Sequence, residues 1–137
     1  RTRKVFSGLA MPLNAEDSGA LCLFSTAAGY TYTLPAAQKG LWFDFLVTVT
    51  ITSVAAKVIC ASGDFLLGSV HQSPDSTTLV AAHAANGTTH LAYSSDGTTT
   101  GGYAGDWLRV TAISSTQWVV QGFSLATGTE ATPFATS

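Results

Sequence analysis

The run GDWLRVTAI at residues 105–113, a Ser-Ser-Thr turn, and QWVVQGF at residues 117–123 decide the fold of this chain. Apolar residues alternate with polar or aromatic ones along the first run, which is the period of a half-buried β-strand. Trp118 and Val120 share one face of the second run, so the two runs predict a β-hairpin. We expect Trp118 to be buried against a strand at 41–52.

The rest of the chain shows the same strand-like patterning and no helical period. In the run at 41–52, Phe43 and Phe45 lie on one face and Asp44 lies on the opposite face, which we expect to be the wetter one. Further strands are predicted at 20–25, 30–34, 55–61 and 65–70.

These strands predict an all-β fold, a compact antiparallel β-sandwich or barrel, with an extended N-terminal arm. The arm covers residues 1–15, where little periodicity is seen, and a single β domain covers residues 16–137. Residues 71–105 are rich in Ser, Thr, Ala, Gly and Asn, and we expect a long loop region there. Short strands inside it are possible at 77–82 and 88–93.

Charge is scarce and unevenly placed. Charged residues make up 10% of the 137 residues, against about 25% in an average soluble domain. A surface so poor in charge suggests contact with other protein. Three of the six basic residues lie in the first four positions, and from residue 5 onward three basic residues face eight acidic ones. This acidic balance excludes nucleic acid as a partner. The sequence has no apolar run of about 18 residues, so no membrane-spanning helix is predicted.

Several short motifs resemble those of small β-rich virion proteins of tailed bacteriophages, namely capsid decoration (cement) proteins and head-fibre domains. The motifs are AGYTYTLP at 28–35, GLWFDF at 40–45, GDW at 105–107 and QWVVQG at 117–122. The resemblance implies a structural virion component that binds the outer capsid surface and stabilises the shell. It also implies a homotrimer whose partner is the major capsid protein, located on the virion and, during assembly, in the host cytoplasm.

The N-terminal arm is the expected attachment segment. Arg1, Arg3 and Lys4 can meet acidic patches of a capsid, and Phe6 can fill an apolar pocket.

No enzymatic activity, metal or cofactor is expected. A G-x-S-x-G nucleophile elbow is missing, and His71, His83 and His90 fit neither a triad nor a zinc-ligand spacing. Asp106 stands at a strand entry, where an aspartate usually accepts hydrogen bonds from nearby backbone amides. Cys22 and Cys60 lie in apolar surroundings without C-x-x-C spacing, which predicts free, buried thiols.

A receptor-binding or glycan-binding domain of a phage head or tail fibre is the alternative, and a hydrolase is a more distant one. Trp42, Tyr103 and Trp107 could stack on sugar rings if they were exposed on one face.

Overall fold

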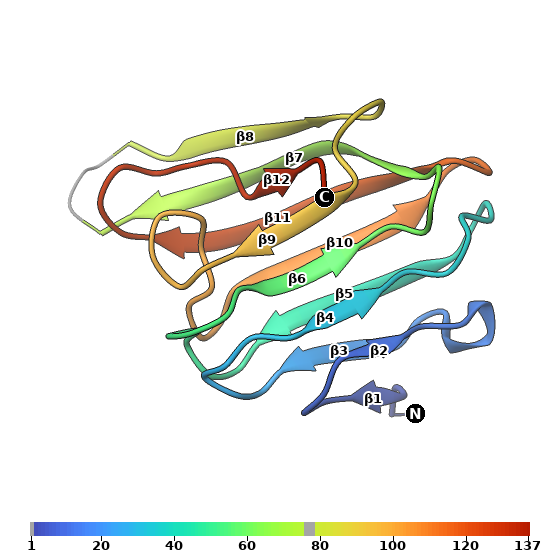
Figure 1. Ribbon diagram of the computed structural model, residues 1–137, viewed down its shortest axis with the longest axis horizontal. Coiled ribbons are helices and arrows are strands. Elements are labelled where there is room, and N and C mark those ends of the chain that lie inside the picture. The colour runs from blue at the N-terminus through green and yellow to red at the C-terminus, as the bar shows by residue number, and fades with distance from the viewer. Residues whose placement is uncertain (1, 76–78) are drawn as a thin grey trace.

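The computed structural model describes residues 2–75 and 79–137, which form two β-sheets packed face to face (Figure 1). In this part of the chain, seven strands make the larger sheet. Their spatial order is β1 (Val5–Phe6), β3 (Leu21–Phe24), β5 (Trp42–Val47), β10 (Trp107–Ala112), β11 (Gln117–Ala126), β7 (Phe65–Pro74) and β8 (Ala81–Asn86). The all-β prediction is confirmed, and two separate sheets are the arrangement of a sandwich.

The smaller sheet contains five strands among the described residues. Their order is β12 (Phe134–Ala135), β9 (Ala92–Ser95), β6 (Ala56–Ile59), β4 (Thr31–Thr33) and β2 (Met11–Pro12). A single 3₁₀ turn at Ala15–Asp17 completes the regular structure of the described chain. No helix in these residues has the length and apolar character needed to cross a membrane.

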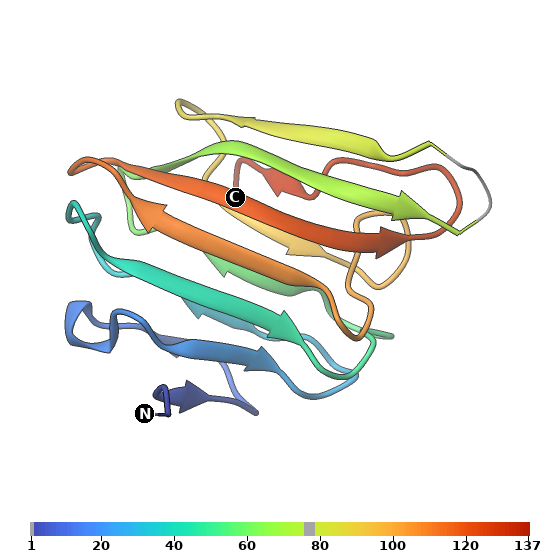
Figure 2. The same cartoon turned by 180° about the vertical axis from the view of Figure 1, so that it is seen from behind.

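The sheets are mixed, with parallel pairs beside the antiparallel pairs that the sequence predicts. From β1 to β7 the chain alternates between the two sheets, as the front and back views show (Figures 1 and 2). Strands that neighbour each other in one sheet are therefore two apart in sequence and run the same way: β1 with β3, β3 with β5, β2 with β4, and β4 with β6. Short-range alternation predicts a strand but not which sheet it joins.

The hairpin predicted from residues 105–123 is confirmed. β10 pairs antiparallel with β11, from Trp107 opposite Phe123 to Ala112 opposite Trp118. β10 also pairs with β5, and β11 pairs in parallel with β7, so the hairpin sits in the middle of the larger sheet rather than at its edge.

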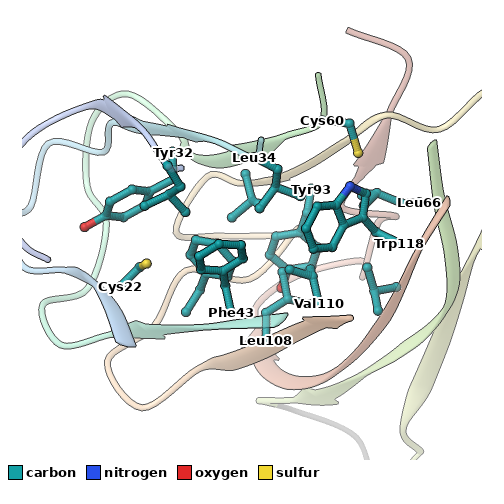
Figure 3. Packing of buried hydrophobic residues seen from close by; sticks show 14 of the residues in the cluster. Cys22, Tyr32, Leu34, Phe43, Cys60, Leu66, Tyr93, Leu108, Val110 and Trp118 are labelled. Atoms are coloured by element: carbon teal, nitrogen blue, oxygen red, sulfur yellow. The ribbon is translucent and has the colours of Figure 1, made fainter. Parts of the chain in front are cut away.

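The core lies between the sheets and includes Trp118, which lies toward one end of the cluster, near Leu66 (Figure 3). Trp118 is fully buried, and its ring centroid lies 6.1 Å from that of Phe43 on β5, which confirms the predicted contact. Tyr32 packs edge-on to Phe24 at 5.2 Å and contacts Phe45 at 5.6 Å. These rings join β3 and β5 of the larger sheet to β4 of the smaller one.

Strands also occur in the two regions where the sequence predicts a long loop region and an extended arm. Strands β7, β8 and β9 occupy much of residues 71–105, while the possible strand at 77–82 lies partly outside the described residues. In the N-terminal segment, β1 pairs with β3, and β2 pairs with β4. The segment thus adds one short strand to an edge of each sheet.

Candidate binding face

The outward side of the larger sheet, called here the apolar face, presents a row of apolar and aromatic side chains. Strand register places Leu46 beside Trp107, Trp107 beside Phe123, and Phe123 beside His71. We call this row the aromatic row; it consists of Leu23, Leu46, Trp107, Phe123, His71 and Ala82. Six strands spaced about 4.8 Å apart give it a length of about 24 Å.

The rings of the aromatic row contact one another. Trp107 and Phe123 stack with centroids 6.2 Å apart and planes 21° apart, and the His71 ring lies 5.9 Å from that of Phe123. Phe123 is 63% exposed, and its neighbour Leu125 on the same face is 48% exposed. Phe123 thus projects from the sheet with most of its surface exposed.

Two shallow hollows flank Phe123. The first lies between Trp107 and His71 and is lined further by Ser69 and Gln121, so it carries no carboxylate, ammonium or guanidinium group. The second is lined by Leu125, Ser73 and the turn at Ala104–Asp106. Phe123 is therefore a raised ring between two depressions, a shape that favours interlocking with a complementary surface.

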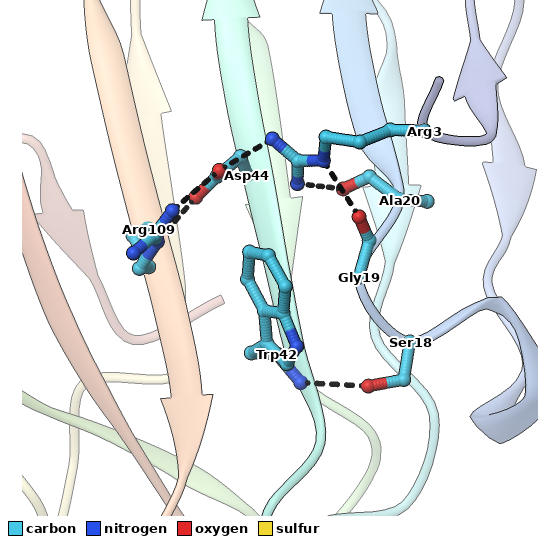
Figure 4. A network of polar contacts seen from close by, with 7 residues as sticks. All are labelled: Arg3, Ser18, Gly19, Ala20, Trp42, Asp44 and Arg109. Carbon is cyan, nitrogen blue, oxygen red and sulfur yellow. Dashed lines mark hydrogen bonds and ion pairs between the residues drawn. The ribbon is translucent and has the colours of Figure 1, made fainter. Parts of the chain in front are cut away.

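Three charged side chains, Arg3, Asp44 and Arg109, form a cluster on the apolar face (Figure 4). Asp44 accepts two hydrogen bonds from Arg109, at 2.7 and 2.8 Å, and one from Arg3 at 2.8 Å. Both guanidinium groups also lie over the Trp42 ring, at 4.9 Å for Arg3 and 4.7 Å for Arg109. The face of β5 that carries Asp44 is the wetter one, as predicted, since Trp42 and Leu46 are partly exposed while Phe43 and Phe45 are buried. Asp44 itself is only 3% exposed, because Arg109 and Arg3 both bond to it.

The charge balance of this cluster explains why it can be buried. Burial by itself would raise the pKa of Asp44, but the hydrogen bonds and charges of Arg109 and Arg3 outweigh it and lower the pKa below its ordinary value. Asp44 therefore remains a carboxylate at neutral pH. The cluster holds two guanidinium groups against this one carboxylate, so its net charge is +1.

The predicted arm residues lie against their own domain. Arg3 donates hydrogen bonds to Asp44 and to the carbonyl oxygens of Gly19 and Ala20. Lys4 Nζ donates to Asp17 Oδ1 at 2.6 Å and lies over the Phe6 ring. Arg1 falls outside the described residues. Their role in capsid binding stays a prediction.

The outward side of the smaller sheet differs in chemistry. Register aligns Thr31 with Lys57 and Lys57 with Ser94, and it places Thr33 beside Ile59. Small polar side chains, one lysine and Ile59 thus take the place of the aromatic row. The sandwich has exposed aromatic side chains on the outward side of the larger sheet and none at these positions of the smaller one.

Residues that could have formed a catalytic or metal site have structural partners instead. The Asp106 carboxylate accepts hydrogen bonds from the backbone N–H groups of Gly102, Tyr103 and Leu125, which confirms its predicted role. His83 bonds to Gln72, and His90 accepts from Asn86 N–H. The described residues contain no group of three His, Cys, Asp or Glu side chains placed to hold a metal ion.

Both cysteines are free and buried, as predicted. Burial raises the pKa of Cys22 and of Cys60 to about 12 in each case. Neither thiol is available as a nucleophile at neutral pH.

The sequence analysis did not identify Phe123 as a surface residue, although the alternation of side chains along its strand indicates it. With Trp118 and Val120 facing inward, the period of two places Phe123 and Leu125 outward. The two tryptophans proposed for sugar stacking, Trp42 and Trp107, are half-buried beneath their neighbours.

Comparison of the chain with protein-family models, curated proteins and solved structures finds no match. Function has to be inferred from the chemistry of the two faces.

Proposed function

We propose that this protein is a non-enzymatic structural component of a bacteriophage virion, a capsid decoration protein that binds the outer capsid surface through its apolar face. The observation that carries the proposal is the asymmetry of the sandwich. The outward side of the larger sheet bears the aromatic row, whereas the outward side of the smaller sheet bears Thr31, Thr33 and Lys57. Such a molecule has one face suited to protein and one suited to solvent.

The way in which charge is used supports this proposal. Arg3 and Arg109 both bond to Asp44, so the two basic groups of the apolar face share one carboxylate within the protein. Binding through this face then depends on apolar burial around Phe123 and Leu125 rather than on exposed ion pairs. The major capsid protein is the proposed partner, and a homotrimer on the virion surface is the proposed assembly, both on the basis of the sequence resemblance.

The test is co-sedimentation with undecorated phage heads. We expect Phe123→Asp to weaken binding by at least about tenfold, since a charge would be buried in place of a central aromatic contact. Thr31→Asp, which adds the same charge to the polar face, should bind like the parent protein. Equal binding by both variants would show that the apolar face is not the attachment surface.

Glycan binding is a second candidate, favoured by the stacked Trp107 and Phe123 rings and by the uncharged polar groups beside them. A sugar ring could stack on Phe123 while Gln121 and Ser69 bond to its hydroxyl groups. A glycan array separates the two functions. A saccharide that binds the parent but not Phe123→Ala, together with unimpaired co-sedimentation of that variant, would favour the glycan function over capsid decoration.

A further inference from the structure

Strand β8 forms one edge of the larger sheet and is paired only with β7, over six residue positions (Figures 1 and 2). The hydrogen bond from Gly87 N–H to Leu66 C=O sets the pattern of this pair. In an antiparallel ladder every second residue bonds to the partner strand, so Ala81, His83 and Ala85 bond to β7. The N–H and C=O groups of Ala82 and Ala84 consequently point away from the sheet.

Nothing in the described chain covers these groups. Ala82 and Ala84 are exposed, and residues 2–75 and 79–137 offer no partner to their outward backbone groups. Asn86, the third outward residue, has its N–H taken by His90 Nδ1 at 3.2 Å. The open part of the edge is therefore short and centred on His83.

The other three sheet edges of the described chain carry features that discourage pairing. β1 has two residues and follows Arg3 and Lys4, β2 has two residues and contains Pro12, and β12 has two residues and follows Pro133. Short strands, prolines and charged neighbours are the usual protection of an edge. β8 is six residues long and has no proline, lysine, arginine or carboxylate.

The sequence of β8 is self-complementary. Residues 81–85 read Ala-Ala-His-Ala-Ala, which is symmetric about His83. If two copies of β8 lie antiparallel with His83 opposite His83, then Ala82 of each copy faces Ala84 of the other. The four outward backbone groups of each copy then pair completely, through four hydrogen bonds across the contact.

We propose that β8 is a two-fold contact between two copies of this chain, in which the larger sheets join edge to edge in the register that places His83 opposite His83. Alanine side chains allow close approach of the two strands. Burial lowers the pKa of His83, with Glu130 opposing the effect, so two neutral imidazoles can face each other at neutral pH. The contact is distinct from the apolar face and from the proposed three-fold assembly; within a trimer it would join one trimer to the next.

The first experiment measures mass by light scattering at protein concentrations from about 10 to 500 µM, because a contact of one strand pair is small. We expect the parent protein to exceed the mass of Ala84→Pro, twofold where that variant is a monomer and more than twofold where it is a trimer, since each trimer has three β8 edges. That substitution removes an outward N–H without touching the bonds to β7, a position where an edge strand tolerates proline. Phe123→Asp is the control, because it changes the apolar face and not β8, and it should keep the parent mass.

The second experiment tests the register with a single cysteine. His83→Cys places two thiols at directly opposed, non-hydrogen-bonded positions, with Cα atoms about 4.5 Å apart. Copper phenanthroline and oxygen should remove two electrons and two protons from this thiol pair to form an intermolecular disulfide. Ala81→Cys, on the same strand and face, lies opposite Ala85 of the other copy and should remain monomeric on a non-reducing gel. Buried Cys22 and Cys60 provide the unmodified background.

The two measurements decide the proposal together. Thermal unfolding of each variant first establishes that it is folded. Equal masses for the parent and Ala84→Pro across the concentration range, or crosslinking of Ala81→Cys as complete as that of His83→Cys, would overturn the two-fold contact. Loss of capsid binding by Phe123→Asp with unchanged mass would leave it intact.

Discussion

Trp118 lies in the core on the inner face of the larger sheet, where it contacts another strand of the same sheet. It enters from β11, packs on Phe43 of β5, and has no exposed surface. Its Nε1 atom has no hydrogen-bond partner among the described residues. The residue therefore contributes apolar contact at the cost of one unpaired donor.

Replacing Trp118 should separate these two effects. We expect Trp118→Ala to lower the free energy of unfolding by about 3–5 kcal/mol, since a large cavity would remain between the sheets. Trp118→Phe keeps an aromatic ring and removes the unpaired N–H, so its cost should be below about 1.5 kcal/mol. Urea unfolding followed by circular dichroism measures both, and similar losses for the two variants would contradict this account.

Asp44 should make stability depend on pH in a defined direction. Its pKa is lower in the folded protein than its ordinary value of 3.8, so the carboxylate stabilises the fold above that value. The stabilisation is lost as the pH falls from about 4 through the lowered folded pKa. We expect the difference in melting temperature between the parent and Asp44→Asn to be large at pH 7 and to shrink toward pH 2. A difference that stays constant would show that Asp44 does not titrate with the predicted shift.

At the scale of strands, Gly68 permits a close backbone approach between β7 and β11 of the larger sheet. Gly68 on β7 has φ of +117°, and a Cβ atom there would lie 2.6 Å from the Val120 carbonyl oxygen on β11. Gly63 also has positive φ, at +87°, but a Cβ atom would meet nothing within 4 Å. An alanine at either position would adopt a strained positive φ, but only at Gly68 would its Cβ atom also collide with the neighbouring strand.

Alanine substitutions at Gly68 and Gly63 test how much the close contact between β7 and β11 contributes to stability. We expect Gly68→Ala to cost about 1–3 kcal/mol more than Gly63→Ala, because only the first forces two paired strands apart. Chemical unfolding of both variants gives the difference. Equal costs would mean that β7 can shift away from β11 without loss.

The elements also show what sequence can reveal about this molecule. Alternation predicted the hairpin, most strands and the burial of Trp118, since each depends on neighbours in sequence. The parallel pairing of β3 with β5 was missed because β4 lies between them in sequence and belongs to the other sheet. For the candidate site, the alternation of inward and outward side chains along β11 is enough to place Phe123 on the surface. The Arg3–Asp44 contact joins residues 41 positions apart, so it can be seen only in the folded chain.

At the scale of the whole molecule, the N-terminal segment and the apolar face offer different means of attachment. Residues 2–12 supply an edge strand to each sheet, β1 and β2. Arg3 bonds to Asp44, and the Tyr32 hydroxyl donates a hydrogen bond to the Phe6 carbonyl oxygen. An arm that binds through Arg3 and Lys4 would first have to leave these contacts. The apolar face needs no such rearrangement.

Deletion of residues 1–8 distinguishes the two. The deletion removes β1 and the Arg3 guanidinium, so we expect a lower melting temperature than that of the parent. Below this temperature the truncated protein should still co-sediment with undecorated heads, because Phe123 and Leu125 remain in place. Apolar contacts are hardly screened by salt, so binding of the intact protein should fall less than about threefold between 50 and 500 mM salt. Loss of binding by the folded truncated protein, with a steep fall of parental binding in salt, would instead place attachment in Arg1, Arg3, Lys4 and Phe6.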